Sequence, residues 1–415
     1  MNCRISSFVY YDSILMRFLL FWIVVLFPLG VLCAEEPLSY CSMNRVCVEF
    51  IPQSKGIDVY FHNRIATEFT ETSLSVDAIL KNMKSSKPLP YLTILKGKKK
   101  KKLFQLKTIH PKRKISYKIQ YKWILGNFNV SHDSSYVYDL PFDPKLKVRV
   151  FQGYHGKKTH TGDNRFSIDF GLKEDDLIFA ARPGIVIDVE EKNNEGGFDP
   201  KFQQSANFVK ILHEDGTIAE YAHLRYMGVV VKRGQSVGVG SILGYAGSTG
   251  YSEGPHLHFE VYQPTKILRK KTIPTRFRTQ MSDAEMLTEG SLVWRREIGN
   301  PLEKKILDVD GISLCDTLDI TMTNRCQLTT FSVVSPIYLT LPIVKPDVYT
   351  FQLNLRKKDS NINYDYTWDS KKEDWVSSFM IPIQEFQEPL EGEWILNVVS
   401  GGVLQKKIEF LVKSI

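Results

Sequence analysis

Residues 247–260 read Gly-Ser-Thr-Gly-Tyr-Ser-Glu-Gly-Pro-His-Leu-His-Phe-Glu, a glycine-rich turn that leads directly into two histidines separated by one residue. Side chains of a β-strand alternate between its two faces, so this spacing predicts that His256, His258 and Glu260 share one face. The leucine and the phenylalanine between them then point to the other face, into a core. The stretch therefore predicts a strand that carries two imidazoles on one polar face.

Two upstream segments supply more groups of the same kind. His160-Thr161-Gly162 opens a segment that ends at Asp169, and Glu220-Tyr221-Ala222 is followed by His223. Two histidines and one carboxylate, with an open fourth position, make up a common type of catalytic zinc site. The three segments together therefore predict an open zinc site with at least one histidine to spare.

The order of these segments resembles that of the M23 peptidases, the lysostaphin-like zinc endopeptidases that cut the peptide part of bacterial peptidoglycan. The resemblance runs from about residue 151 to 261 and includes, besides residues 247–260, the segments Gln152-Gly153, His160-Thr161-Gly162, Ile168-Asp169-Phe170, Ala180 to Val186, Tyr221-Ala222-His223-Leu224 and Val231 to Gln235. The separation of His160 from Asp169 is longer than in the family's shortest pattern. Asp163 is therefore an alternative ligand.

The resemblance implies a role for each candidate residue. His160, Asp169 and His258 are implied as the zinc ligands. His256 matches the general base, and His223 matches a companion that orients the water molecule or stabilises the oxyanion. An imidazole at such a place can accept a proton near neutral pH, and the sequence does not decide which of the two histidines contributes more.

Three other residues near these segments have simpler interpretations. Glu260 fits either a hydrogen bond to a metal-binding histidine, which usually has such a partner, or an ordinary salt bridge. His155, in the loop before His160, fits either a place that lines the groove or a plain surface position, and the surface position is favoured. His213 receives no functional role.

The central segment also predicts a compact β-sheet domain. Residues 208–213 and 217–223 flank Glu214-Asp215-Gly216, and an Asp-Gly pair between two apolar runs is a strong hairpin signal. Frequent glycines and β-branched residues without a long helical period favour a β-sheet over an α/β fold. The polar insertion 191–206 is expected to form a loop over the groove.

The flanking regions read as β-structure as well, so the predicted class is mainly β, with a catalytic domain between two sandwich-like accessory domains. Apolar residues alternate at 115–123 and at 349–355. Residues 91–95 and 103–108 are predicted to form a hairpin with a lysine-rich tip, which either grips an anionic polymer or is a solvated loop. A short helix is expected near residues 282–287. The predicted domains are 1–34 (signal peptide), 35–147, 148–277 and 278–415.

The N-terminus and the cysteines predict export. An uncharged run at residues 18–34 precedes two glutamates, which fits a cleaved signal peptide better than a retained membrane anchor. The remaining cysteines form two close pairs, Cys41/Cys47 and Cys315/Cys326, which are typical of disulfides in an oxidising compartment. We therefore expect a protein of the periplasm, the cell envelope or the extracellular space, with membrane contact only through an uncleaved N-terminal segment.

The composition and the absence of certain motifs exclude several classes of function. The chain has 415 residues, 43% of them hydrophobic, and a formal net charge of +8, which favours association with anionic polymers. Basic runs lack the interleaved aromatic residues typical of single-strand nucleic-acid binding, and His-Glu-x-x-His, Gly-x-Ser-x-Gly and phosphate-loop motifs are absent. Together with these observations, the resemblance to the M23 peptidases implies a zinc-dependent endopeptidase that hydrolyses peptide cross-links of peptidoglycan.

Two alternatives belong to other classes. One is a non-catalytic cell-wall-binding or amidase-activating relative, and such proteins have lost zinc ligands, whereas all five candidate residues are present here. The other is a structural adhesin in which the accessory domains matter most.

Overall fold

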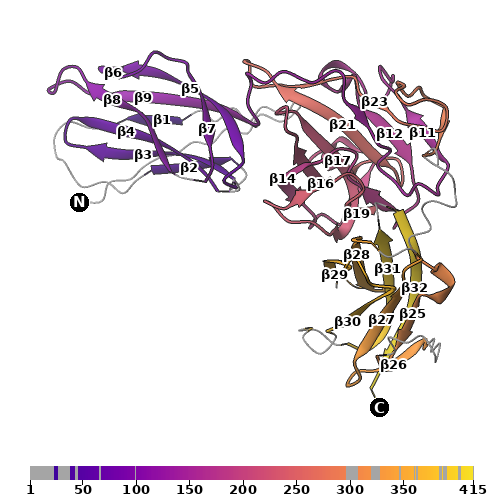
Figure 1. The fold of residues 1–415 in the computed structure, drawn as a ribbon. Coiled ribbons are helices and arrows are strands. Elements are labelled where there is room, and N and C mark those ends of the chain that lie inside the picture. The colour runs from indigo at the N-terminus through magenta and orange to yellow at the C-terminus, as the bar shows by residue number, and fades with distance from the viewer. Residues whose placement is uncertain are drawn as a thin grey trace.

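The computed structural model describes residues 23–26, 38–42, 45–64, 67–98, 100–295, 307–318, 328–344, 347–358, 360, 363–382, 386, 390–400 and 403–414. These residues form β-strands and three short 3₁₀-helices, which confirms the predicted mainly β class. Figure 1 shows three β-rich units in chain order. The central unit lies at the corner of a bent row, with the N-terminal unit to its left and the C-terminal unit below it. Among the described residues, no helix has the length and apolar character needed to cross a membrane.

The N-terminal unit is a sandwich of two antiparallel sheets. One sheet has the order β1-β9-β5-β7, and the other has the order β2-β3-β4-β8-β6. Apolar side chains from both sheets, such as Val48, Leu74 and Tyr121, form one buried core between them. The strands are β1 (Ile23–Leu26), β2 (Leu38–Ser42), β3 (Val46–Gln53), β4 (Gly56–Asn63), β5 (Glu71–Lys81), β6 (Met83–Ser85), β7 (Tyr91–Lys96), β8 (Lys101–Thr108) and β9 (Ser116–Leu125).

The predicted hairpin around the lysine-rich tip is wrong. Strand β7 pairs with β5 in one sheet, whereas β8 pairs with β4 and β6 in the other, so the lysine-rich segment crosses between the two sheets. Alternating apolar residues report which face of a strand is buried, but not which strand lies beside it. Lys102 pairs with Asp58 at 2.6 Å and Lys100 pairs with Glu49, so part of this charge is neutralised within the unit.

The predicted disulfides and the predicted signal peptide have different outcomes. Cys41 and Cys47 form a disulfide between adjacent strands, as expected, whereas Cys326 lies outside the described residues. Most of the predicted signal peptide also lies outside them. Its described part, β1, pairs with β9 at the edge of a sheet. Cleavage near residue 34 would therefore remove this edge strand from the sandwich.

The central unit is built on one large, mostly antiparallel sheet. Its main order is β18-β14-β16-β17-β21-β12-β11-β24, with β13, β19 and β22 attached at the side. The described strands and 3₁₀-helices are β10 (Val137–Tyr138), β11 (Val148–Gln152), η1 (Gly162–Asn164), β12 (Ile168–Gly171), β13 (Leu177–Phe179), β14 (Gly184–Glu190), β15 (Gly196–Gly197), η2 (Pro200–Phe202), β16 (Asn207–Leu212), β17 (Ile218–Val229), β18 (Ser236–Val237), β19 (Ile242–Ala246), β20 (Gly250–Tyr251), β21 (Leu257–Pro264), β22 (Lys270–Thr272), β23 (Arg276–Phe277) and β24 (Leu292–Val293).

The predicted hairpin of the central unit is confirmed by the pairing of β16 with β17. Gly216 adopts φ +79° in the turn, a conformation that favours glycine. The predicted short helix near residue 282 is wrong, because this segment is irregular and forms a bridge between Phe277 and Glu285. The buried core extends from Tyr138 to Val293, and so beyond the predicted domain range of 148–277 at both ends.

The C-terminal unit is a second sandwich. Its sheets have the orders β25-β27-β30 and β26-β32-β31-β28-β29, with a common apolar core that includes Leu339, Phe351 and Trp394. The alternating run at 349–355 forms β28, as predicted. The elements are η3 (Val309–Gly311), β25 (Ser313–Cys315), β26 (Thr330–Ser332), β27 (Ile337–Pro342), β28 (Thr350–Lys357), β29 (Asn363–Asp369), β30 (Val376–Ile381), β31 (Gly392–Ser400) and β32 (Val403–Lys413).

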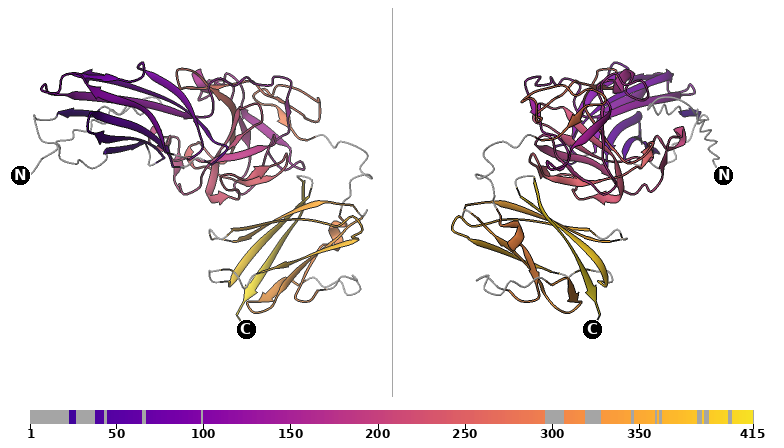
Figure 2. Two further views of the ribbon diagram at one scale, coloured as in Figure 1. Left: turned by 60° about the vertical axis from the view of Figure 1, so that its left-hand side comes forward. Right: turned by 90° about the vertical axis from the view of Figure 1, so that its right-hand side faces the viewer.

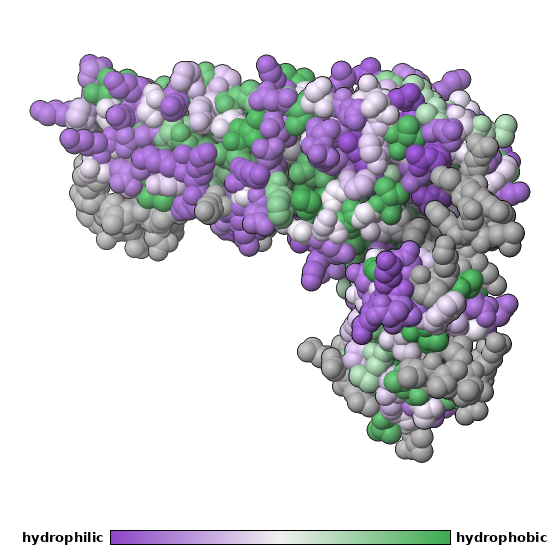
Figure 3. All heavy atoms as spheres, viewed as in Figure 1, coloured by the Kyte–Doolittle hydropathy of each residue, from purple (hydrophilic) through white to green (hydrophobic). Residues whose placement is uncertain are grey.

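The N-terminal unit meets the central unit through an apolar contact and an ion pair. Leu125 packs with Ile218 and Tyr262 in a small buried cluster. Beside it, Arg45 pairs with Asp188 at 2.5 Å. Figure 3 shows hydrophobic residues gathered near this junction, while hydrophilic side chains cover most of the N-terminal unit on that face.

The C-terminal unit contacts the central unit on another side, as the two views in Figure 2 show. Val399 packs with Tyr245 and Phe179 in a buried cluster. Asp175 of the central unit accepts hydrogen bonds from Arg356 at 3.2 and 3.3 Å. Both flanking units are thus attached to the central unit by apolar and charged contacts.

Candidate metal centre

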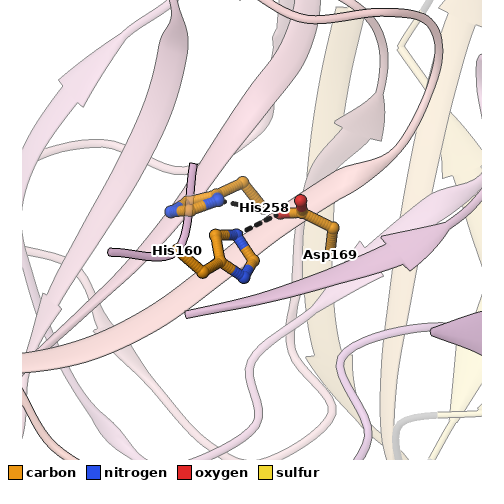
Figure 4. Close-up of side chains that lie close together, drawn as sticks. All are labelled: His160, Asp169 and His258. Atoms are coloured by element: carbon orange, nitrogen blue, oxygen red, sulfur yellow. Dashed lines mark hydrogen bonds and ion pairs between the residues drawn. The ribbon is translucent and has the colours of Figure 1, made fainter. Parts of the chain in front are cut away.

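Three predicted ligands meet at one point of the central sheet. Asp169 of β12 and His258 of β21 are opposite each other in the antiparallel register. His160 comes from the loop before η1, and one ligand atom from each of the three residues lies within 4.8 Å of the others. Figure 4 shows the three side chains converging. The structure therefore brings together the set that the sequence analysis assigned to zinc.

In the neutral form of His160, the ring nitrogen without a proton faces a carboxylate. Its Nδ1 donates a hydrogen bond to the carbonyl of Gly153 at 2.9 Å, which places the proton of the neutral ring on that nitrogen. Its Nε2 is buried, has no hydrogen-bond partner, and lies 3.1 Å from Oδ1 of Asp169. Two electron-rich atoms at this distance require a proton or a cation between them. A cation bound by both satisfies the arrangement.

Asp169 is held by a residue that sequence reasoning did not assign. The amide of Gln152 donates to Oδ2 of Asp169 at 3.1 Å, while Oδ1 accepts from Nδ1 of His258 at 2.9 Å. Burial raises the pKa of Asp169, but the adjacent imidazoles of His160 and His258 outweigh it and hold the pKa well below its usual value. A Cβ at Gly156 would lie 2.3 Å from Cγ of Gln152, so a side chain there would displace the glutamine.

His258 has a partner on each ring nitrogen. Nδ1 faces Asp169, and Nε2 lies 3.4 Å from Oε2 of Glu260, which confirms that Glu260 shares the polar face of the strand. Burial lowers the pKa of His258, but the two carboxylates outweigh it and raise the pKa to about 9. Both ring nitrogens of His258 thus face carboxylate oxygens.

His223 and His256 lie next to the three ligands, with ring centroids 4.6 Å apart. Nδ1 of His223 donates to the carbonyl of Thr249 at 2.7 Å, and Nδ1 of His256 donates to that of Gly254 at 2.8 Å. Each neutral ring thus keeps an unprotonated Nε2. Burial lowers the pKa of both histidines, that of His223 to about 3. Both rings are therefore neutral near pH 7.

The remaining predicted candidates lie outside this cluster. Asp163 is in η1 and is not part of the ligand group found among the described residues. His155 is exposed and packs edge-on against Phe166. His213 is buried and donates to the carbonyl of Pro183 at 2.8 Å, and burial lowers its pKa to about 4.

The insertion 191–206 reaches the glycine-rich approach to the histidine pair. Its strand β15 pairs with β20, and Phe198 stacks on Tyr251 with ring centroids 4.8 Å apart. Phe198 is exposed. Sequence reasoning predicted a loop over the groove but did not identify this aromatic pair, because neither residue has a partner close to it in the chain.

Comparisons with known proteins agree with the geometry. Residues 163–270 match the model of peptidase family M23, and the matched segment contains every candidate residue of the site except His160. An uncharacterized metalloprotease of Buchnera aphidicola is 33% identical over 154 residues, which cover 36% of this chain and 38% of the relative.

Two further relatives have named activities. Glycyl-glycine endopeptidase ALE-1 of Staphylococcus capitis is 33% identical over 100 residues, which cover 24% of this chain and 25% of the relative. Peptidoglycan DD-endopeptidase ShyA of Vibrio cholerae is 27% identical over 119 residues, which cover 28% and 25%, respectively. The chain thus matches between 25% and 38% of the length of these three relatives.

Among solved structures, a mutant catalytic domain of the prophage-encoded M23 protein EnpA from Enterococcus faecalis is 25% identical, with 32% of this chain and 94% of that chain covered and a TM-score of 0.25. The catalytic domain of lysostaphin from Staphylococcus simulans is also 25% identical, with coverages of 31% and 87% and a TM-score of 0.22. The family match thus shows that residues 163–270, which lie in the central unit, are similar to peptidase family M23.

Proposed function

We propose that this protein is a zinc-dependent endopeptidase that hydrolyses peptide cross-links of bacterial peptidoglycan. The observation that carries the proposal is the buried Nε2 of His160, which has no hydrogen-bond partner and faces Asp169 at 3.1 Å. Two relatives of the central unit are named as a glycyl-glycine endopeptidase and a peptidoglycan DD-endopeptidase, which supports the choice of substrate.

The donor atoms suit zinc. Nε2 of His160, Oδ1 of Asp169 and Nδ1 of His258 would hold the ion, and two imidazoles with one carboxylate form a frequent ligand set of catalytic zinc. When bound, zinc lowers the pKa of water towards about 7 and polarises a carbonyl group. Each proposed ligand is also held by a second contact, which leaves its donor atom free for the ion. These contacts are with Gly153 for His160, Gln152 for Asp169 and Glu260 for His258.

His256 and His223 would manage the proton. Their Nδ1 atoms are occupied by backbone carbonyls, so Nε2 of each is available to accept a proton from the attacking water. Nε2 of His256 lies 3.8 Å from Oδ1 of Asp169, which places it beside the proposed ligands and supports its role as the general base. His223 would then orient the water or stabilise the developing negative charge.

Export and the division into domains belong to the same proposal. The disulfide between Cys41 and Cys47 fits an oxidising compartment, where peptidoglycan is also found. We propose a periplasmic, envelope or extracellular protein that binds no nucleic acid and contacts the membrane only through its N-terminal segment if that segment is not cleaved. The flanking sandwiches, within about residues 35–147 and 278–415, would tune location and access.

The test uses the purified full chain, its zinc content and its action on purified peptidoglycan. We expect one zinc ion per chain and the release of new amino groups from the peptide cross-links. A chelator should abolish this release, and added zinc should restore it. Zinc binding without hydrolysis would instead favour the non-catalytic wall-binding or amidase-activating alternative, and failure to bind zinc would overturn the proposal.

A further inference from the structure

A buried carboxylate lies directly behind one proposed zinc ligand. The side chain of Glu260 has 0% exposure and follows His258 by two positions on the same face of β21. Its Oε2 accepts a hydrogen bond from Ser167 at 2.8 Å and lies 3.4 Å from Nε2 of His258. Its Oε1 pairs with the ammonium group of Lys270, a residue of β22. Both oxygens of the carboxylate are thus held in place.

Stability alone does not account for this ion pair. Removing a carboxylate and an ammonium group from water is costly, and well-packed apolar residues at such places often give equal or greater stability. By contrast, a metal-binding histidine needs a partner on its second ring nitrogen, which fixes its tautomer and the orientation of the ring. The place of Glu260 behind His258 meets this need.

We propose that Glu260, held by Lys270 and Ser167, is a positioning residue that fixes the ring of His258 for zinc. This inference rests on the proposed function. Lys270 belongs to strand β22 and Ser167 is the residue before β12, and both strands pair with β21. By binding one oxygen each they aim Oε2 at Nε2 of His258, so that Nδ1 faces the proposed metal position.

The neighbouring strand provides a matched control. Glu220 of β17 is opposite Glu260 in the antiparallel register, and its carboxylate pairs with Lys210 at 3.2 Å. The two lysine side chains have the same exposure, 15%, and the glutamates have 5% and 0%. The pair formed by Lys210 and Glu220 thus reproduces the burial and charge of the pair formed by Lys270 and Glu260, one strand further from the ligand.

The experiment measures zinc affinity of the full chain by competition with a chelator, and stability by urea unfolding of the zinc-free protein. We expect Glu260→Met/Lys270→Met, which removes both charges together, to fold and to bind zinc about 10–100-fold more weakly, the usual effect of losing such a partner. Glu260→Gln keeps an acceptor atom and should recover part of the loss. Glu220→Met/Lys210→Met should bind zinc like the unchanged chain.

A second readout separates positioning from a general loss of structure. The visible absorption of the Co²⁺-loaded protein reports ligand geometry, and it should change in the Glu260 variants but not in the Glu220 variant. Unchanged zinc affinity and an unchanged cobalt spectrum in Glu260→Met/Lys270→Met would overturn the inference and leave the proposed function intact. If the unaltered chain binds no zinc, the proposed function itself fails.

Discussion

At the scale of single residues, the second ring nitrogen distinguishes two histidines that share one strand face. His258 uses its second nitrogen to contact the Glu260 carboxylate, whereas His256 donates from Nδ1 to a backbone carbonyl and keeps Nε2 free. A partner carboxylate suits a ligand, and a free nitrogen next to the ligands suits a base. Identical side chains two positions apart are therefore expected to differ in function.

The first prediction compares alanine variants of these two histidines. His258→Ala would leave two protein ligands, so both zinc and activity should be lost. His256→Ala should retain near-stoichiometric zinc and the fold but lose on the order of 10²–10⁴ in rate, the usual contribution of a general base. Zinc analysis and peptide turnover measure both effects. Zinc loss confined to His256→Ala would reverse the roles, and full activity in both variants would remove the catalytic interpretation.

The second prediction concerns the pH dependence of stability and rests on His213, away from the metal centre. Burial lowers its pKa from 6.5 to about 4, so the unfolded chain binds more protons than the folded chain between these values. The free energy of unfolding should therefore fall as the pH decreases through this window and level off below it, by at most about 3 kcal/mol from this residue.

Urea unfolding of the unchanged chain and of His213→Gln at pH 7 and pH 5 checks this expectation. The substitution removes the titrating group, so the stability difference between the two pH values should be smaller in the variant. Equal differences in both proteins would contradict the assignment of this pH dependence to His213.

At the scale of elements, strand pairing assembles the site. The register of β12 and β21 places Asp169 opposite His258, and the pairing of β17 and β21 places Ala222 beside the same histidine, so that His223 follows at the edge of the cluster. His223 adopts φ +65°, a conformation unusual for a residue with a side chain, where the pairing of β17 becomes irregular. The candidate metal centre thus lies where the regular pairing of β17 ends.

The third prediction tests the contact between the insertion and the glycine-rich approach. A Cβ at Gly196 would lie 1.9 Å from the carbonyl oxygen of Ser248, so Gly196→Ala must separate β15 from β20. Because Thr249 accepts the hydrogen bond of His223, this shift should misplace the histidine and lower turnover by up to about 10²-fold. Zinc content should stay unchanged.

A glycine away from the centre serves as the control. A Cβ at Gly238 would come no closer than 4.0 Å to its nearest neighbour, so Gly238→Ala should have little effect on turnover. Normal turnover in Gly196→Ala would show that the insertion does not support the position of His223.

At the scale of the whole molecule, all proposed chemistry lies in the central unit. The three ligands and the contacts that fix them come from residues between Gln152 and Lys270, and the buried core extends from Tyr138 to Val293. The flanking sandwiches touch the central unit through Leu125 on one side and Val399 on the other. These two contacts include none of the proposed ligands.

The fourth prediction follows from this arrangement. A fragment of about residues 134–295 should fold and bind one zinc ion, because it contains the entire core cluster and every proposed ligand. Circular dichroism and zinc analysis provide the test, with His258→Ala in the same fragment as the control. A folded fragment without zinc would mean that one of the flanking units supplies a ligand.

The sequence by itself determined the β class, several strands and the group of ligands. Alternation along 256–260 and along 349–355 is a local property, and the side-chain faces that it predicts are those observed. The resemblance to a family likewise identified His160, Asp169 and His258, which the structure brings within 4.8 Å of one another.

Only the tertiary structure decided which strands are neighbours and which groups hold the ligands. Strands β7 and β8 look like a hairpin in the sequence but lie in different sheets. Likewise, Gln152 reaches Asp169 across the pair of β11 and β12, and Lys270 reaches Glu260 across the pair of β21 and β22. The physical reason is that the side-chain pattern of a strand reports which of its faces is buried, whereas its neighbours are chosen by packing across the whole core.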